Sequence, residues 1–422
     1  MNDAHAVAAP AAPGPTAVSA PAPSRTPAPL SGWGLMVMLS ALMALTSLST
    51  DIYLPAMPTM QRELQGNAEL TITGFLIGFA LAQLVWGPVS DRIGRRRPLR
   101  IGMALFVLGS IGCALSTSIT QIVFWRLFQA FGACTGPMLA RAMVRDLHER
   151  SQAAETLSTL TLIMALAPIA GPLLGGQMLR IGSWHAIFWL LAAVGLVMLA
   201  ALRRLPETHA PARRATTPAS GALADYRALL GNGRFMRPTL CVTFFYVGAY
   251  AFIAGSPRVY IDHFHVAAQH YGWLFGVNLI GVMALSAVNR RLVRCYRLDA
   301  LLRVATAVAA LAMVAGLGVS RAPDAALWTV ALPVAVFFSM NGILAASATA
   351  AALDGVPHVA ASAAALIGAL QYGSGIVSTL LLTALSDGSP RAMVGVMAVF
   401  ALAAAGMAFW PAGAQVSAAT RP

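Results

Sequence analysis

Two charged side chains, Asp51 and Arg126, lie in segments that are otherwise apolar and long enough to cross a bilayer. A carboxyl group in such a segment is costly and commonly faces a cavity, where it takes part in a proton pathway. An arginine in such a segment stays charged and therefore needs a partner. The two residues are expected at similar depths. The sequence therefore predicts that Asp51 pairs with Arg126 and that the pair couples the protein to protons.

Both residues also have a simpler interpretation. Pro55 can end the membrane portion of the first segment, which would leave Asp51 at the wet interface. Arg126 lies near the start of its segment and can extend its guanidinium group to the interface. We favour the proton-coupling interpretation, in which Gln129 extends the polar face that carries Arg126.

Aromatic and polar residues in several apolar segments are candidates for binding an apolar substrate. The same residue types also serve packing and interhelical hydrogen bonding, and the sequence does not separate these roles. The candidate substrate-binding residues are Tyr53, Gln129, Phe245, Tyr246, Tyr250, Asn278, Asn341 and Gln371.

A short charged loop from Gly87 to Arg97 separates two apolar runs, each close to the length of a membrane span. Five residues of this loop are candidates for a functional role, namely Gly87, Asp91, Arg92, Gly94 and Arg95. Gly87 would allow close helix contact, and Asp91 would pair with an arginine of the loop or with the end of a neighbouring helix. The alternative is a solvated turn that only sets orientation in the membrane.

A later segment contains two prolines and three glycines within nine residues, at Pro168, Gly171, Pro172, Gly175 and Gly176. Proline removes a backbone hydrogen bond and glycine removes side-chain bulk, so this pattern predicts a kinked helix that packs tightly against its neighbours.

The composition is typical of a membrane protein and excludes several functions. Hydrophobic residues make up 58% of the 422 residues and charged residues only 10%. Every basic residue is an arginine, so the lysine of a Walker A loop and that of a retinal Schiff base are both missing. The acid and histidines at 262–270 match no standard metal-ligand spacing, and no nucleophile, base and orienting acid are assembled. We expect no enzyme activity, no metal and no cofactor.

The apolar runs predict an all-α membrane protein with twelve transmembrane helices in two six-helix bundles. The expected spans are 33–56, 70–90, 98–116, 119–143, 154–179, 185–203, 238–260, 271–289, 300–320, 326–351, 359–385 and 391–411. We expect a disordered cytoplasmic tail at 1–32, an N-terminal bundle at 33–203, a cytoplasmic linker at 204–237, a C-terminal bundle at 238–411 and a cytoplasmic tail at 412–422.

The positions of the arginines predict the orientation of these spans. If the N-terminus is cytoplasmic, five of the 28 arginines fall outside, at Arg62, Arg180, Arg258, Arg321 and Arg391, and Arg126 falls within a span. The other 22 fall inside. Because cytoplasmic loops are enriched in arginine, both termini are expected in the cytoplasm. The net charge of +13 then reflects membrane orientation, and we expect no binding to nucleic acid.

Several of these motifs resemble those of the major facilitator superfamily of secondary transporters. The loop matches the pattern G-x-x-x-D-R-x-G-R, and the segment from Arg126 to Gly132 matches R-x-x-Q-G-x-G except that Ala130 replaces a glycine. The run from Gly171 to Gly176 resembles the G-P-x-x-G-G motif of drug–proton antiporters. The segments 50–58, 140–146 and 256–261 resemble the Bcr/CflA group of drug-resistance transporters.

This resemblance implies a multidrug or antibiotic efflux transporter of the bacterial inner membrane. It would work as a monomer and export small amphipathic compounds by alternating access, driven by an inward proton flux and without a cofactor. In this family the charged loop is a cytoplasmic latch that biases the outward-facing state. Two alternatives remain: a proton-coupled metabolite or nutrient transporter of the same fold, and a membrane receptor or structural protein that does not transport.

Overall fold

The computed structural model describes residues 32–147, 150–209, 220–320, 326–356, 359–385 and 388–411, and the residues described are helical or in short connections. The disordered tail expected at 1–32, apart from Gly32, and the cytoplasmic tail expected at 412–422 lie outside the described residues.

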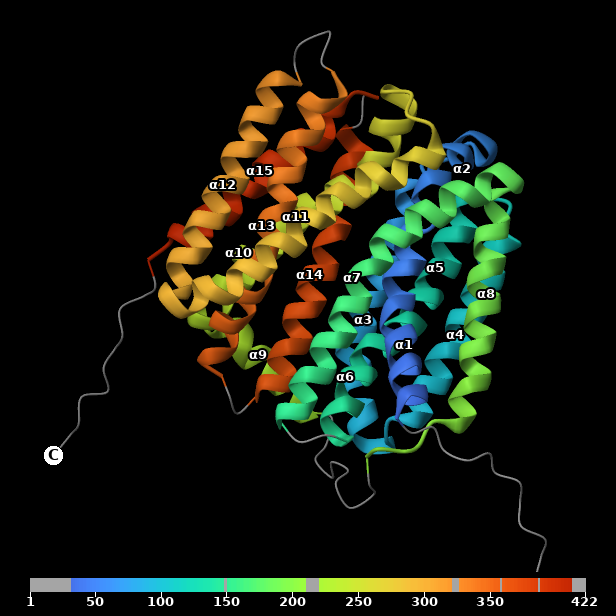
Figure 1. Cartoon of the computed structure of the whole chain (residues 1–422), viewed down its shortest axis with the longest axis vertical. Coiled ribbons are helices and arrows are strands. Elements are labelled where there is room, and N and C mark those ends of the chain that lie inside the picture. The colour runs from blue at the N-terminus through green and yellow to red at the C-terminus, as the bar shows by residue number, and fades with distance from the viewer. Residues whose placement is uncertain are drawn as a thin grey trace, which may run out of the picture.

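The first part of the chain forms eight α-helices and two short 3-10 turns (Figure 1). The α-helices are α1 (Trp33–Asp51), α2 (Met57–Leu64), α3 (Glu69–Ile93), α4 (Arg96–Ala114), α5 (Ile119–Ala133), α6 (Thr135–Leu147), α7 (Arg150–Ile181) and α8 (Trp184–Ala201). The 3-10 turns are η1 (Leu54–Ala56) and η2 (Leu202–Arg204).

The rest of the described chain forms seven further α-helices and one π-helical turn. These are α9 (Ser220–Gly231), α10 (Gly233–Pro257), the π-helical η4 (Arg258–His263), α11 (Ala268–Cys295), α12 (Leu298–Val319), α13 (Leu327–Asp354), α14 (Ala360–Leu385) and α15 (Pro390–Phe409). Figure 1 shows α1–α8 on one side of the molecule and α10–α15 on the other, with α7 beside α11 and α3 beside α14 where the two groups meet.

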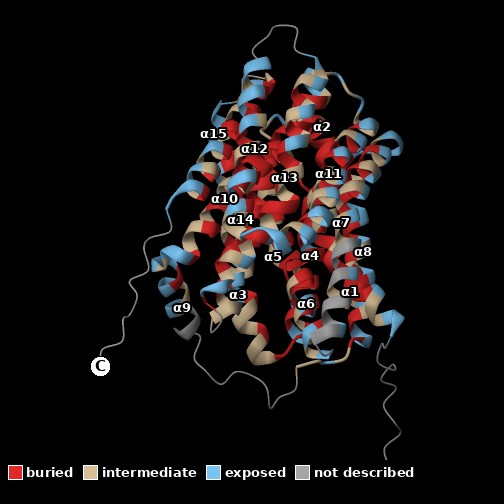
Figure 2. Ribbon diagram, turned by 60° about the vertical axis from the view of Figure 1, so that its left-hand side comes forward, coloured by how far each residue is buried: buried red, intermediate tan, exposed pale blue. Residues whose placement is uncertain are grey.

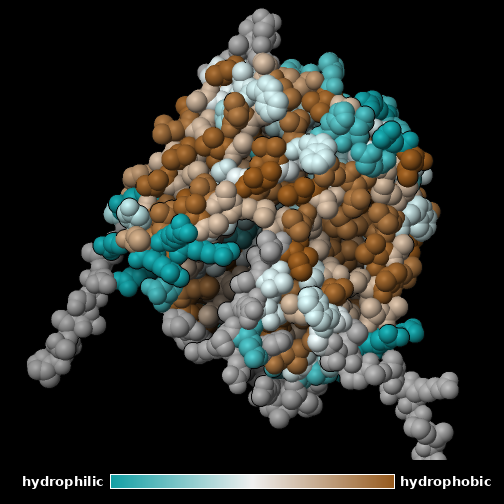
Figure 3. Space-filling view, viewed as in Figure 1, coloured by the Kyte–Doolittle hydropathy of each residue, from teal (hydrophilic) through white to brown (hydrophobic). Residues whose placement is uncertain are grey.

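Ten helical segments among the described residues are long and apolar enough to cross a membrane. The two other expected spans correspond to α5 with α6 and to α7. The chain is therefore a multi-pass membrane protein with the expected twelve-helix architecture. Hydrophobic side chains cover much of the face seen in Figure 3, and hydrophilic side chains gather towards its two ends.

Two expected spans differ from the observed helices. The span expected at 33–56 already ends as an α-helix at Asp51, and the chain turns through η1 into α2 because Pro55 and Pro58 cannot continue the hydrogen-bonding pattern of α1. The span expected at 119–143 is interrupted at Cys134, between Gly132 and Gly136. Both glycines lie where an added Cβ would overlap a neighbouring backbone, on α4 and α1 respectively, so this interruption lies at a site of close helix contact.

Local signals in the sequence explain several helix ends. Ser118 and Asn232 each accept a hydrogen bond from a backbone N–H of the first turn that follows, at the starts of α5 and α10. Ser389 does the same for α15, which begins with a proline. Gly94 ends α3 with a φ of 90°, a backbone conformation that residues with a side chain rarely adopt.

The contacts that join α1–α8 to α10–α15 lie mainly towards the end of the molecule that carries α2, here called the α2 end. Thr73 of α3 bonds to Thr379 of α14, with 2.6 Å between their hydroxyl oxygens. Gly176 of α7 faces the backbone of Ala268 and Gln269 at the start of α11. The opposite end carries the segment from Gly87 to Arg97 and is called the loop end. The loop expected there is shorter in the structure, because α3 continues to Ile93 and α4 begins at Arg96.

Buried residues line the interior where the helices meet, and exposed residues lie on the outer faces (Figure 2). Along α3 and α14 the close approach extends from the α2 end as far as Gln83 and Gly368. Towards the loop end the surface in Figure 3 is hollowed between the two groups of helices. The site described next lies in the interior near the α2 end, where the two groups of helices contact each other.

Candidate functional site

Arg126 lies on α5 in the interior, and its side chain is 0% exposed. Its Nη1 donates hydrogen bonds to the backbone oxygen of Ser49 (2.9 Å) and to Oε1 of Gln129 (2.6 Å). The guanidinium carbon also lies 4.4 Å from the ring centre of Tyr53 and 4.3 Å from that of Phe75. Nε and Nη2 are buried and have no hydrogen-bond partner. The guanidinium group therefore keeps unused donors in the interior and does not reach the interface.

Gln129 positions this guanidinium group. Its Oε1 accepts from Arg126, and its Nε2 donates to Oγ of Ser110 on α4 at 2.7 Å. Gly109 makes this contact possible, because a Cβ at that position would meet the backbone of Gln129 within 2.5–2.7 Å. Gln129 is fully buried and engaged in these two bonds in this conformation.

Asp51 is the last residue of α1, and its side chain is buried, with a relative exposure of 6%. It lies against the proline- and glycine-rich run of α7, because a Cβ at Gly171 would be 3.3 Å from the Cβ of Asp51. Arg126 acts on the carboxyl group electrostatically. Tyr53, two residues further on, contacts Arg126 and shares a hydrogen bond of 3.1 Å with Thr71.

The direct ion pair expected between Asp51 and Arg126 is not formed in this conformation. Ion pairs within 4.0 Å that do form among the described residues include Arg62–Asp262, Arg95–Asp91, Arg95–Asp146 and Arg237–Asp299. The physical reason lies in the contacts of Arg126, whose guanidinium group is held between two aromatic rings while one of its nitrogens bonds to a carbonyl and an amide oxygen.

The proline- and glycine-rich run of α7 packs between α1 and α11. Gly171 faces Asp51, and a Cβ at Gly175 would overlap the backbone oxygen of Ile52. Gly176 faces the backbone at the start of α11. Pro168 and Pro172 lie within the same continuous helix. The run therefore connects the segment that carries Asp51 with the contact between the two groups of helices.

Aromatic side chains from three helices gather near Asp51. The ring centres of Phe79 and Tyr372 are 4.0 Å apart, and Tyr250 lies 6.2 Å from both Tyr372 and Tyr246. Asp51 acts electrostatically on both Tyr250 and Tyr372. We call Phe79, Tyr246, Tyr250 and Tyr372 the tyrosine cluster.

The other candidate substrate residues differ in their surroundings. Asn341 lies beside Tyr246, and its buried Oδ1 has no hydrogen-bond partner. Phe245 is fully buried and stacks on Phe337 with ring centres 4.3 Å apart, and its ring centre lies 6.2 Å from that of Tyr246. Asn278 is buried and donates to the backbone oxygen of Leu274 at 3.3 Å. Gln371 precedes Tyr372 on α14 and is half-buried, and its backbone oxygen accepts a hydrogen bond from Oγ of Ser374 at 2.6 Å.

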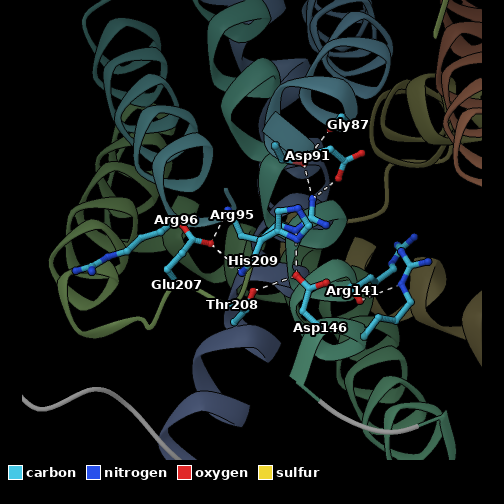
Figure 4. A network of polar contacts seen from close by, with 11 residues as sticks. Gly87, Asp91, Arg95, Arg96, Arg141, Asp146, Glu207, Thr208 and His209 are labelled. Atoms are coloured by element: carbon cyan, nitrogen blue, oxygen red, sulfur yellow. Dashed lines mark hydrogen bonds and ion pairs between the residues drawn. The ribbon is translucent and has the colours of Figure 1, made fainter. Parts of the chain in front are cut away.

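The charged loop forms a closed network at the loop end (Figure 4). Arg95 is largely buried, and its guanidinium group pairs with Asp91 at 2.6 Å and with Asp146 of α6 at 3.1 Å. It also donates to Oγ of Ser90 at 2.9 Å. Burial alone would lower the pKa of Arg95, but the hydrogen bonds to Asp91 and Asp146 raise it overall, so this arginine stays charged.

Glu207 completes the network from the segment after η2. Its carboxylate accepts from the backbone N–H groups of Arg95 (2.8 Å) and Arg96 (3.2 Å), at the start of α4 where a negative charge is favoured. Thr208 donates to Asp146 at 3.1 Å. The sequence analysis missed both residues as latch partners, since more than a hundred residues separate Glu207 from Arg95. In this conformation Gly87 makes no close helix contact, because a Cβ there would meet no atom within 4 Å.

Comparisons with known proteins support the resemblance seen in the motifs. A profile of the Major Facilitator Superfamily matches residues 39–379. The chain is 35% identical over 385 residues to a Bacillus subtilis (strain 168) protein named uncharacterized MFS-type transporter YdgK, covering 87% of this chain and 95% of that protein. It is 28% identical over 366 residues to the Haemophilus influenzae bicyclomycin resistance protein homolog (86% and 92% covered). It is 29% identical over 362 residues to Escherichia coli multidrug resistance protein D (82% and 88% covered).

Solved structures show the same fold at low sequence identity. The xylose transporter XylE from E. coli, in a partially occluded inward open conformation, aligns with a TM-score of 0.70 at 15% identity, covering 90% of this chain and 98% of that one. The nucleoside transporter NupG aligns with a TM-score of 0.66 at 16% identity, covering 89% of this chain and 97% of that one. The predicted resemblance is confirmed, and the chain belongs to the major facilitator superfamily.

Proposed function

We propose that this protein is a proton-coupled exporter of small amphipathic drugs, working by alternating access in a bacterial inner membrane. The observation that carries the proposal is the buried carboxyl group of Asp51, which lies near the fully buried Arg126 and the tyrosine cluster. Buried ionisable residues in membrane segments mark ion and proton pathways. Relatives named for bicyclomycin and multidrug resistance support drugs as the cargo.

Alternating access assigns a direction to the observed conformation. The two groups of helices contact each other towards the α2 end, and the surface is hollowed towards the loop end. The arginine distribution supports a cytoplasmic location for the loop end and for both chain termini. On this assignment the conformation is inward-facing, and a drug enters from the cytoplasm. A fluorescent protein fused to the C-terminus, which fluoresces only in the cytoplasm, tests this orientation.

In the proposed cycle the proton on Asp51 and the drug are not bound at the same time. Asp51 takes up a proton from the outer side, which removes the attraction between its carboxylate and Arg126 and favours the return to the inward-facing state. Facing inward, Asp51 releases the proton as the drug enters. The separation of Asp51 from Arg126 in this conformation supports that order, because a protonated carboxyl group needs no cationic partner.

The tyrosine cluster is the proposed drug contact. Aromatic faces offer contact area to apolar and cationic drugs, and the unpartnered Oδ1 of Asn341 beside the cluster offers a hydrogen-bond acceptor. The proton gradient drives the cycle, so no cofactor, no catalysis and no second subunit are required.

Everted membrane vesicles test the proposal directly, because respiration acidifies their interior. We expect a panel of fluorescent amphipathic drugs to accumulate in vesicles that carry this protein, and a protonophore to abolish the accumulation. Vesicles that carry the Asp51→Asn variant are the control and should not accumulate the drugs. An uptake transporter of the same fold would move its cargo in the opposite direction, and a receptor would move none. Either result would overturn the proposal.

A further inference from the structure

A second buried carboxyl group, that of Glu69, lies at the α2 end, outside the site described above. Glu69 is the first residue of α3 and has a relative exposure of 3%. Its backbone N–H donates to Oδ1 of Asn67 at 2.9 Å. Its side-chain Oε2 is buried and has no hydrogen-bond partner. A charged carboxylate in this state is costly, and a position in the first turn of a helix offsets only part of that cost.

Glu69 lies where the two groups of helices meet. Asn67, two residues earlier, donates from Nδ2 to Oγ1 of Thr383 on α14 at 3.2 Å. Thr73, one turn later, shares a hydrogen bond of 2.6 Å with Thr379 on the same helix. Each contact joins residues that are more than 300 positions apart in sequence. Glu69 therefore lies between two polar contacts that must break if the α2 end opens.

A charge from the other group of helices acts on Glu69. Arg258, the first residue of η4, acts electrostatically on the Glu69 carboxyl group. Further out, Arg62 of α2 pairs with Asp262 of η4 at 3.3 Å, but both side chains are exposed. An exposed pair contributes little because water and salt screen it, whereas the buried carboxylate is screened much less.

We propose that Glu69 is a protonation site that controls the opening of the α2 end, separate from Asp51. The charged carboxylate attracts Arg258 across the contact between the two groups of helices and holds this end closed. Protonation from the α2 side removes this attraction and lets the end open. The proposal rests on the proposed function only in calling this end external.

Spin labels on the α2 end measure this opening. Thr120, at the start of α5, and Ala326, just before α13, are exposed and lie on different groups of helices. Both are changed to cysteine in a background that carries Cys295→Ser, since Cys295 is the exposed native cysteine and the other three are buried. The distance distribution between the labels is recorded by electron–electron resonance in lipid nanodiscs, from about pH 5 to about pH 8.

With native Glu69 we expect the population with a longer label distance to grow as the pH falls. In the Glu69→Gln variant, whose side chain cannot ionise, we expect this population to be large at every pH, with a rise of roughly tenfold in the open-to-closed ratio at pH 8. The Glu69→Asp variant keeps a carboxyl group and should keep the pH response. A Glu69→Gln variant that responds to pH as the native protein does, or that stays closed throughout, would overturn the proposal.

Other groups at this end also titrate and need their own control. His263, His265 and His270 are exposed in and after η4, and histidine changes charge between about pH 5 and pH 8. A variant with all three changed to glutamine should keep the response that Glu69 provides. Loss of the response in this variant would assign it to the histidines and refute the role of Glu69.

A second variant separates the charge effect from simple loosening of the contact. Thr383→Val removes the acceptor of the Asn67 hydrogen bond without changing a charge. It should raise the open population by a similar factor at every pH and leave the pH response in place. These measurements need neither drug nor proton gradient. A contrary result here would therefore refute the role of Glu69 but not drug export. A contrary result in the vesicle experiment would refute drug export but not the role of Glu69.

Discussion

Two buried arginines of this protein have contrasting surroundings. Arg95 at the loop end pairs with Asp91 and Asp146. Arg126 in the interior has no carboxylate within 4.0 Å among the described residues, and its Nε and Nη2 lack hydrogen-bond partners. A cation with complete pairing stabilises one arrangement of the helices, whereas a cation with unused donors can accept a new partner during a cycle. The contrast supports a structural role for Arg95 and the proposed coupling role for Arg126.

The largest effect is expected for Arg126→Lys. Lysine keeps the charge but loses the planar fork that bonds to Ser49 and Gln129 and lies between two rings. We expect drug export in cells to fall by about 100-fold, which corresponds to a loss of about 2.7 kcal/mol of coupling free energy. The amount of protein in the membrane should stay similar. Export at the native level in this variant would show that charge alone is sufficient at this position.

Arg95→Gln should instead act on stability. Removing this cation leaves Asp146 partly buried without its ionic partner and removes the ion pair that links the connection between α3 and α4 to α6. We expect a loss of about 2 kcal/mol in the free energy of unfolding, because Asp146 is only partly shielded from water. Thermal unfolding of the purified protein in detergent measures this loss. If Arg126→Lys destabilised the protein more than Arg95→Gln did, the contrast between the two sites would be wrong.

Tyr372→Leu tests whether the working site includes the tyrosine cluster. Loss of the ring that contacts Phe79 and Tyr250 should weaken drug binding by about tenfold, or about 1.4 kcal/mol. Phe337→Leu is the matched control, because Phe337 is fully buried and its ring packs against Phe245 and Phe338 in the interior of the second group of helices. Tryptophan fluorescence titration with a transported drug compares the two. Equal losses of affinity would remove the distinction between cluster and packing residues.

The smallest effects are expected when the two latch glycines, Gly87 and Gly94, are replaced, and these effects are on stability. Gly94 has a φ of 90°, so Gly94→Ala should cost about 1 kcal/mol of stability. Gly87→Ala should change the stability by less than about 0.5 kcal/mol in this conformation, because a Cβ there meets no atom within 4 Å. Thermal unfolding distinguishes them, and a larger loss for Gly87→Ala would indicate that another conformation with close contact at Gly87 dominates.

The helices were predictable because apolar runs of about twenty residues and the prolines and glycines between them are visible locally. The turn after Asp51 follows from Pro55, although the sequence analysis extended the span beyond it. The partners of Arg126 were not predictable, because every backbone carbonyl and aromatic ring of a span is a possible partner until helix rotation is known. Glu69 was placed just outside a span that was expected to begin at residue 70, and its burial depends on contacts with residues more than 300 positions away.

Drug-induced proton release by the purified protein tests the role of Asp51 most directly. In weakly buffered detergent solution, addition of a transported drug should release protons from the native protein, and the drug should bind to the Asp51→Asn variant without proton release. Asp51→Asn should also bind the drug with an affinity that no longer changes with pH. Equal proton release from the native protein and from Asp51→Asn would contradict the assignment of Asp51 as the coupling group.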